Sequence, residues 1–289
     1  MSATSEPRGS IFRDFNAAAL GAGLTAYFWF AFGTVPIHLA IASQLGLSPA
    51  QSSSWIFIVW FGGALSTIAI DLYYRQPIPI TWTGPGLIYL GTLAGHFQYS
   101  ELVGASLMAG VVILVLALAG VGARLIAWLP LPIILGMFAG SILGYITRMV
   151  RATVDDIAIA GPTVLGYLIG KMIGRQSVPP MGFAVIFGAA AIYLQQEGAP
   201  PPILWVPPAL AVPAMKFTLS SFVAVSLPLV VLALGMGNVQ GLGYLIAQGY
   251  RVPVNQVSIV VGLNSIVNPF LGGHPATVAR TGAAIVAGP

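Results

Sequence analysis

The stretch Asn268-Pro269-Phe270-Leu271-Gly272-Gly273-His274-Pro275-Ala276-Thr277 interrupts an apolar chain with proline, glycine and histidine, where a membrane span would be expected to continue. An earlier stretch, Gln76-Pro77-Ile78-Pro79-Ile80-Thr81-Trp82-Thr83-Gly84-Pro85-Gly86, has the same character. Irregular backbone at membrane depth persists only where it is buried in protein or lines a cavity. Two broken spans in corresponding positions of two halves therefore indicate the binding site of a transporter.

Both stretches predict a short strand followed by a half-helix. We expect residues 81–83 and 270–272 to be extended and to meet near mid-membrane. The half-helices are expected to begin near Pro85 and Pro275, because proline suits the first helical turn, where its missing N–H would have no partner.

Composition identifies a membrane protein. Charged residues make up 6% of the chain and hydrophobic residues 57%, whereas soluble domains have roughly 25% charged residues. The mean hydropathy is +0.91. There is no cysteine, which excludes disulfides and thiolate chemistry. The basic residues lie mostly in short loops, where they are a topology signal rather than a sign of nucleic-acid binding.

Apolar segments predict an all-α polytopic fold, because a helical span needs about 20 apolar residues. Eight continuous spans are expected near residues 16–43, 52–74, 101–120, 130–147, 157–173, 181–196, 218–238 and 254–268. The broken spans near 77–97 and 268–288 bring the expected crossings to ten. The proline-rich connection 197–217 is predicted to be an irregular external loop.

The distribution of Lys and Arg favours a cytoplasmic N-terminus. With that orientation seven basic residues lie inside and three outside, which agrees with the excess of positive charge in cytoplasmic loops. No cleavable signal is expected, because residues 1–15 are polar and no short apolar core with a cleavage site follows. The expected location is the inner (plasma) membrane.

A weak internal repeat supports two halves. The segment 39–51 resembles 244–256, and each half then reaches its broken span. Seven crossings separate the two broken spans, and this odd number makes the predicted repeats inverted.

Several ordered motifs resemble the benzoate membrane transport family, within the larger group that includes nucleobase and sulfate permeases. They are Tyr74-Arg75-Gln76-Pro77 leading into Trp82-Thr83-Gly84-Pro85-Gly86, Ser226-Leu227-Pro228-Leu229, Gln248-Gly249-Tyr250 before Pro253, and Pro269-Phe270 with Gly272-Gly273-His274. The resemblance runs from about residue 16 to the end of the chain.

The resemblance implies fourteen spans in two inverted repeats of seven, with a core domain and a gate domain. The expected divisions are a cytoplasmic tail (1–15), core spans 1–4 (16–120), gate spans 5–7 (121–196), an external loop (197–217) and core spans 8–10 (218–289). Four spans of the family pattern are not in this sequence, so a truncated, non-transporting membrane subunit is an alternative.

The half-helix N-termini are the first candidate site, because unpaired N–H groups and the helix dipole favour an anion. The candidates are Thr83, Gly84, Pro85 and Gly86 in the first break and Gly273, His274, Pro275, Ala276 and Thr277 in the second. The alternative is a pair of proline-kinked packing helices that bind nothing.

Polar and aromatic residues in spans 8 and 1 are further candidates. Asn238 and Gln240 are expected either to bond a substrate carboxylate or a backbone group of span 10, or only to cap the end of span 8. Tyr27 and Phe30 share a helical face and are candidates for stacking on an aromatic substrate. The alternative for these rings is ordinary lipid or core packing.

Two ionisable residues complete the candidate site. His274 is expected either to couple a proton to the substrate or, as a neutral imidazole, to bond a strand carbonyl. Arg280, inside the tenth span, is expected either to attract anions on the cytoplasmic path or to snorkel to the surface. His38 and His96 are predicted to be interfacial.

The sequence thus predicts a secondary active transporter of a small organic anion, with benzoate or a related aromatic carboxylate preferred and proton coupling expected. A sulfate-like anion or a nucleobase is the alternative substrate, although span 8 lacks the acidic residue of nucleobase permeases. No metal, cofactor or catalytic residue is predicted, and the expected partners are the anion, the proton and the lipid bilayer. A homo-oligomer is left open.

Overall fold

The computed structural model describes residues 16–122, 124, 132, 147, 150–173, 180–196 and 205–287. Its helices are α2 (Ala17–Gln44), α3 (Pro49–Tyr74), α4 (Gly84–Thr92), α5 (Tyr99–Leu118), α8 (Ile157–Ile173), α9 (Pro180–Gln195), α10 (Leu219–Ser221), α11 (Leu227–Val230), α12 (Val239–Ala247), α13 (Val254–Val267) and α14 (Arg280–Val286). Two π-helical turns, η1 (Phe222–Ser226) and η2 (Val231–Asn238), and one 3-10 turn, η3 (Asn268–Leu271), complete the helical structure.

The predicted polytopic helical fold is confirmed. Five described helices, counting α10 to α12 as one and α13 with η3 as another, are long and apolar enough to cross a membrane, and α8 and α9 are shorter apolar helices. Most predicted spans agree with the observed helices to within a few residues. The predicted span 130–147 lies almost wholly outside the described residues.

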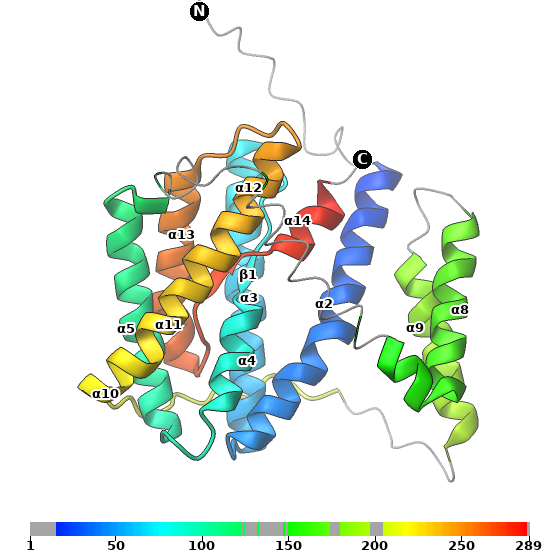
Figure 1. Ribbon diagram of the computed structural model, residues 1–289, viewed down its shortest axis with the longest axis horizontal. Helices are drawn as coiled ribbons and strands as arrows, with labels where there is room; N and C mark the ends of the chain where they lie inside the picture. The colour runs from blue at the N-terminus through cyan, green and yellow to red at the C-terminus, as the bar shows by residue number, and fades with distance from the viewer. Residues whose placement is uncertain are drawn as a thin grey trace, which may run out of the picture. The chain divides into compact units, whose positions relative to one another are not determined.

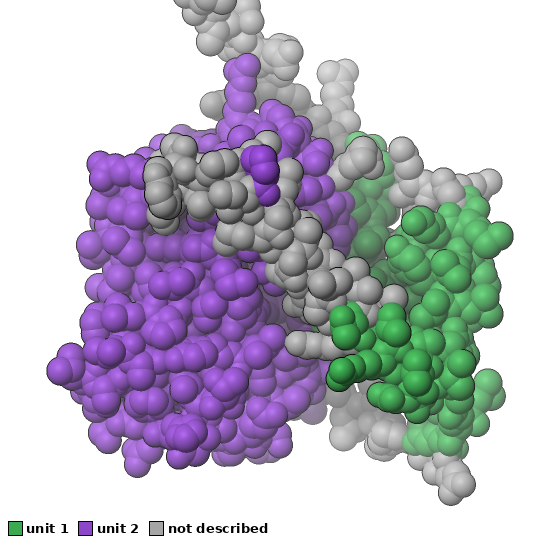
Figure 2. Space-filling view, in the orientation of Figure 1, with its two compact units in different colours: residues 1–33, 147–202 green, residues 34–146, 203–289 purple. Residues whose placement is uncertain are grey.

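The chain divides into two compact units (Figure 2). Unit 1 comprises residues 1–33 and 147–202, and it contains the paired helices α8 and α9. Unit 2 comprises residues 34–146 and 203–289. The second half of α2 and both broken spans belong to unit 2.

Helices α5 and α13 lie side by side in unit 2 (Figure 1). A β-carbon on Gly110 of α5 would lie 2.5 Å from the carbonyl oxygen of Ser265, and one on Gly262 of α13 would lie 2.7 Å from the Cα of Leu114. Glycines therefore let these two backbones approach closely, which is how apolar helices associate without a hydrophobic driving force between them.

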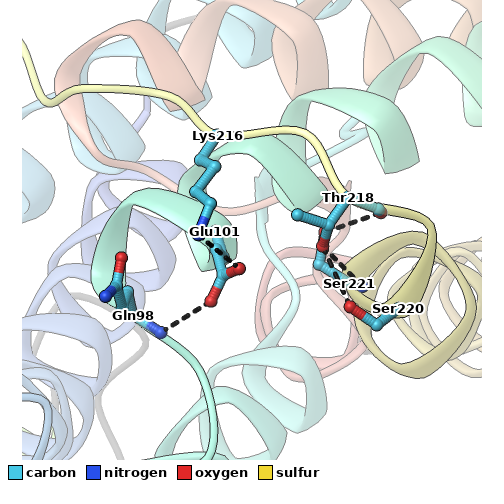
Figure 3. Close-up of polar contacts among 6 residues, drawn as sticks. All are labelled: Gln98, Glu101, Lys216, Thr218, Ser220 and Ser221. Atoms are coloured by element: carbon cyan, nitrogen blue, oxygen red, sulfur yellow. Dashed lines mark hydrogen bonds and ion pairs between the residues drawn. The ribbon is translucent and has the colours of Figure 1, made fainter.

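The start of α5 is fixed by polar contacts (Figure 3). The Glu101 carboxylate accepts a hydrogen bond from the N–H of Gln98 at 3.1 Å and pairs with Lys216 Nζ at 3.2 Å. The N–H of Lys216 also donates to the carbonyl of Ser100 at 2.9 Å. Residues 205–218 contain neither helix nor strand, and these contacts attach their end to unit 2.

The two breaks meet as an antiparallel pair of strands, β1 (Ile80–Trp82) and β2 (Ala276–Val278). Thr81 lies opposite Thr277 at the centre of the pair. Two further bonds extend it, from Thr83 N to Pro275 O at 3.0 Å and from Ala279 N to Pro79 O at 2.7 Å. Each bond is the two-fold counterpart of the other, so the local arrangement is symmetric about the two central threonines.

The first break is as predicted. Residues 80–82 form β1, Thr83 is extended, and α4 begins at Gly84 with Pro85 in its first turn.

The prediction for the second break is wrong by about one helical turn. Residues 268–271 form a 3-10 turn that Gly272 ends at a φ of 85°, a left-handed conformation that glycine adopts at little cost. The strand follows at Ala276, and α14 begins at Arg280 rather than near Pro275. Strand pairing shows the reason: Pro275 occupies the place of Pro79, before the strand, and not that of Pro85, inside the helix.

Span 8 is longer than predicted and contains two π-helical turns. Its helical structure continues to Ala247. Asn238 and Gln240 therefore lie inside the span, and the alternative that they only cap its end is wrong.

Pro228 of span 8 has no N–H to donate to the carbonyl of Ala224, four residues earlier. The Tyr89 hydroxyl of α4 donates to that carbonyl instead. Local π-helical turns often mark functional positions.

Candidate functional site

Hydroxyl groups from the preceding helices hold the two strands in place. Thr67 Oγ1 of α3 accepts a hydrogen bond from Ile80 N at 2.8 Å. In the matching place, Ser265 Oγ of α13 accepts from Ala276 N at 2.9 Å. In both strands, a buried backbone N–H thus has a hydroxyl group of the protein as its hydrogen-bond acceptor. Such partners matter because an unpaired backbone group at membrane depth would cost several kcal/mol.

Helix α4 has an N-terminus that is largely satisfied. Thr83 is fully buried, and its Oγ1 accepts from Gly86 N at 3.3 Å as the N-cap. Gly86 packs tightly, since a β-carbon there would lie 2.4 Å from Thr83 Cγ2. Gly84 is different, because a β-carbon there would meet no atom of the described residues within 4 Å, its chain neighbours and its own helix backbone aside. Open space therefore borders this half-helix at Gly84.

Helix α14 presents hydrogen-bond donors instead. Its N-cap, Ala279, has no side-chain cap. Among the described residues, the N–H groups of Arg280, Thr281 and Gly282 have no acceptor. The Arg280 guanidinium is half-buried and donates from Nη1 to Gln240 Oε1 at 3.0 Å. No carboxylate pairs with Arg280 in the part of the chain that the structure describes.

Asn238 joins η2 to the second strand. Its Oδ1 accepts from Val278 N at 2.9 Å and lies 3.1 Å from Thr277 Oγ1, which also lies 2.8 Å from Ala233 O. The single hydroxyl proton of Thr277 serves one of these two oxygens at a time. Asn238 Nδ2 is buried without a partner among the described residues. The oxygens of Asn238 and Gln240 are thus engaged, and the unpaired groups here are donors.

A cluster of two imidazoles and two indoles lies beside β1. His38 and His274 are fully buried, and their ring centroids lie 5.9 Å apart. His38 also packs against Trp82 at 5.0 Å and against Trp55 at 5.9 Å, with ring planes at 79° and 76°. The prediction that His38 is interfacial is wrong, because α2 turns this residue toward the core of unit 2.

Both nitrogens of His274 are occupied. Trp55 Nε1, which can only donate, bonds His274 Nδ1 at 3.0 Å. His274 Nε2 lies 3.2 Å from Thr83 O, which can only accept. These partners assign a neutral ring with its proton on Nε2. The strand carbonyl expected as a partner of a neutral His274 is that of Thr83, the N-cap of α4.

The remaining predicted site residues are placed as follows. Gly273, Pro275, Ala276 and Thr277 are buried in the turn before β2 and in β2 itself. Ala276 is fully buried in the strand pair, so a bulky residue there would disturb the fold and does not test ligand binding. Tyr27 and Phe30 lie in the first half of α2, which belongs to unit 1, whereas the other predicted site residues belong to unit 2.

The sequence reasoning missed the cluster around His38. His38, Trp55 and Trp82 come from three segments, and their spacing along the chain gives no sign of contact. The available signal was the presence of polar and aromatic residues within apolar spans, since a buried polar group in a membrane protein needs a partner.

Paired discontinuous spans and a donor-rich site beside them define a polytopic membrane transporter. The chain matches the benzoate membrane transport protein family over residues 13–289 and belongs to that family.

The chain is also similar to two curated proteins. The chain is 25% identical over 276 residues to a benzoate membrane transport protein of Acinetobacter baylyi, an alignment that covers 96% of this chain and 70% of that protein. It is 24% identical over 245 residues to the inner membrane protein YdcO of Escherichia coli, covering 84% of this chain and 62% of that protein. The chain therefore spans about two thirds of the length of these relatives.

Proposed function

We propose that this protein is a proton-coupled transporter of benzoate or a related aromatic carboxylate in the inner membrane, with a cytoplasmic N-terminus. Family membership and the name of the Acinetobacter relative support the substrate. The basic residues of the loops support the orientation. The charge of the substrate supports proton coupling, because a carboxylate is ionised at neutral pH and one proton per anion would make its transport electroneutral.

One observation carries the proposal. Arg280 has no carboxylate partner among the described residues, lies at the start of α14 and is held by Gln240. Asn238 Nδ2 and three backbone N–H groups nearby are also unpaired within the described structure. A site that offers donors and a positive charge, with the side-chain oxygens of Asn238 and Gln240 already engaged, suits a carboxylate, whose oxygens only accept.

The donors of this site also bear on the alternative substrates, a nucleobase and a sulfate-like anion. A nucleobase needs both donors and acceptors, and the side-chain oxygens of Asn238 and Gln240 are already engaged, so the donor-rich site favours an anion. A sulfate-like anion would fit the donors equally well. The preference for a substrate with a ring therefore rests on family membership and on the name of the Acinetobacter relative. A non-transporting subunit would bind none of these ligands.

Uptake of radiolabelled benzoate by liposomes that contain the full-length protein tests the proposal. Benzoic acid crosses lipid unaided in its neutral form, so the informative quantity is the saturable initial rate above that of protein-free liposomes. We expect this component to rise with an inward proton gradient and to be blocked by unlabelled benzoate. Inhibition by sulfate or uracil but not by benzoate would favour the alternatives, and the absence of any saturable component would favour a subunit.

Gly84→Leu should remove benzoate binding while the protein stays folded. The leucine side chain would fill the space beside the N-terminus of α4, where a β-carbon would meet no other described residue within 4 Å beyond its own helix and chain neighbours. Gly84→Ala, which adds only that β-carbon, should bind nearly as well as the unchanged protein. Isothermal titration calorimetry in detergent measures both. Normal benzoate binding by a folded Gly84→Leu protein would mean that the ligand lies elsewhere.

A further inference from the structure

The two buried imidazoles of unit 2 differ in what their nitrogens can accept. His274 has no nitrogen open to a further proton, because Nδ1 already accepts from the Trp55 indole and Nε2 carries its own proton toward Thr83 O. Protonation of Nδ1 would place two N–H groups against each other and break the bond to Trp55. His274 is therefore constrained to remain neutral as long as Trp55 stays in place.

His38 has the opposite arrangement. Its Nδ1 lies 3.0 Å from the carbonyl of Thr34, which can only accept, so Nδ1 carries the proton. Nε2 is left with a bare lone pair, and this atom is buried with no hydrogen-bond partner in the described structure. A buried polar atom without a partner is uncommon and calls for a physical reason.

The surroundings of His38 suit an imidazolium that forms only transiently. The indoles of Trp82 and Trp55 lie 5.0 Å and 5.9 Å away, within the distance at which aromatic rings stabilise a cation. Of the described residues, the titratable group that faces it is His274, from the turn before β2. Helix α4, whose Gly91 packs against Ile41 of α2, has no charged residue.

We propose that Nε2 of His38 is the site where a proton binds together with the anion. The proposal rests on the proposed function of proton-coupled carboxylate transport. An imidazolium buried without a counter-charge is costly, so the proton binds well only when the anion is present. By thermodynamic reciprocity the proton strengthens anion binding by the same factor, and benzoate affinity should therefore rise as pH falls.

Calorimetric titration of the full-length protein with benzoate, in buffers of different ionisation enthalpy, measures the protons taken up on binding. We expect about one proton per benzoate in the unchanged protein, as linkage requires for one site, and the same uptake in His96→Gln, which removes an exposed imidazole between α4 and α5. His38→Gln should take up none and should bind benzoate roughly 5- to 150-fold more weakly at low pH, the usual range of such coupling. His38→Phe keeps a ring of similar shape and replaces the glutamine variant if that variant does not fold.

Imidazole nitrogen NMR of histidine-labelled protein tests the assignment by observing the protonation of each histidine directly. The chain has three histidines, and the His96→Gln and His274→Gln variants assign their signals. As pH falls in the presence of the bound anion, or of chloride if benzoate does not bind, Nε2 of His38 should become protonated before His274 changes.

These outcomes distinguish the proposed substrate, benzoate, from the assignment of the proton site to His38. Protonation of His274 before His38, or full proton uptake by His38→Gln, would overturn the assignment to His38. Benzoate binding without proton uptake in the unchanged protein would overturn it too, while the proposed substrate would stand. A protein that binds no benzoate but protonates His38 first would lose its proposed substrate and keep this site.

Discussion

Arg280→Ala should weaken benzoate binding by roughly 10- to 150-fold, because a hydrogen bond to a charged group contributes about 1.5–3 kcal/mol. The Arg280 guanidinium is half-buried, and Gln240 is its described partner, at 3.0 Å. Its positive charge has no carboxylate to neutralise it among the described residues. Arg280→Lys should recover part of the lost affinity, because it restores the charge without the planar pair of donors.

Calorimetry at fixed ionic strength measures this effect. The matched control is Arg251→Gln, which removes an exposed positive charge from the loop between α12 and α13 and should leave the affinity unchanged. Equal benzoate affinity in a folded Arg280→Ala protein would show that the carboxylate binds elsewhere and would leave Arg280 with a structural role.

Gly237→Ala should abolish measurable benzoate binding and lower the melting temperature of the purified protein. A β-carbon on Gly237 would lie 1.8 Å from Thr277 Oγ1 and 2.7 Å from Thr277 Cβ. Thr277 is central in β2 and is held between Ala233 O and Asn238, so it cannot move without pulling the strand away from η2. Overpacking of this kind costs about 1–3 kcal/mol, and it would displace the donors around Asn238 as well.

The control lies two residues away in the same π-helical turn. A β-carbon on Gly235 would have its nearest neighbour, Val231 Cγ1, at 3.8 Å, an ordinary van der Waals contact. Gly235→Ala should therefore melt and bind like the unchanged protein. If Gly237→Ala behaved the same way, the close approach of η2 to β2 would not be needed for binding.

The sequence by itself was sufficient to locate most spans. The length of an apolar run is a local property, so residues 49–74, 157–173 and 254–267 were predicted to within a few positions. The first break was also predictable, because the run from Pro79 to Gly86 contains one strand and one helix start with proline and glycine at their usual places.

The second break depended on the tertiary structure. Both Pro275 and the glycines before it fit a helix start in isolation, and only pairing with β1 shows that Pro275 matches Pro79 and that α14 starts at Arg280. The same holds for Asn238 and Gln240. Their side chains accept from Val278 N and Arg280, partners about 40 residues away whose contact no sequence spacing indicates.

The states of the two imidazoles were likewise decided by the fold. From the sequence, His274 was the candidate for proton coupling because it sits in a broken span, and His38 was expected at a membrane interface. Which ring nitrogen of a histidine can accept a further proton depends on the groups packed around the ring. Trp55, Thr83 and Thr34 set this choice. Apolar length and breaker residues thus determined where the chain crosses and where it is interrupted, whereas long-range packing determined which polar atoms remain unpaired.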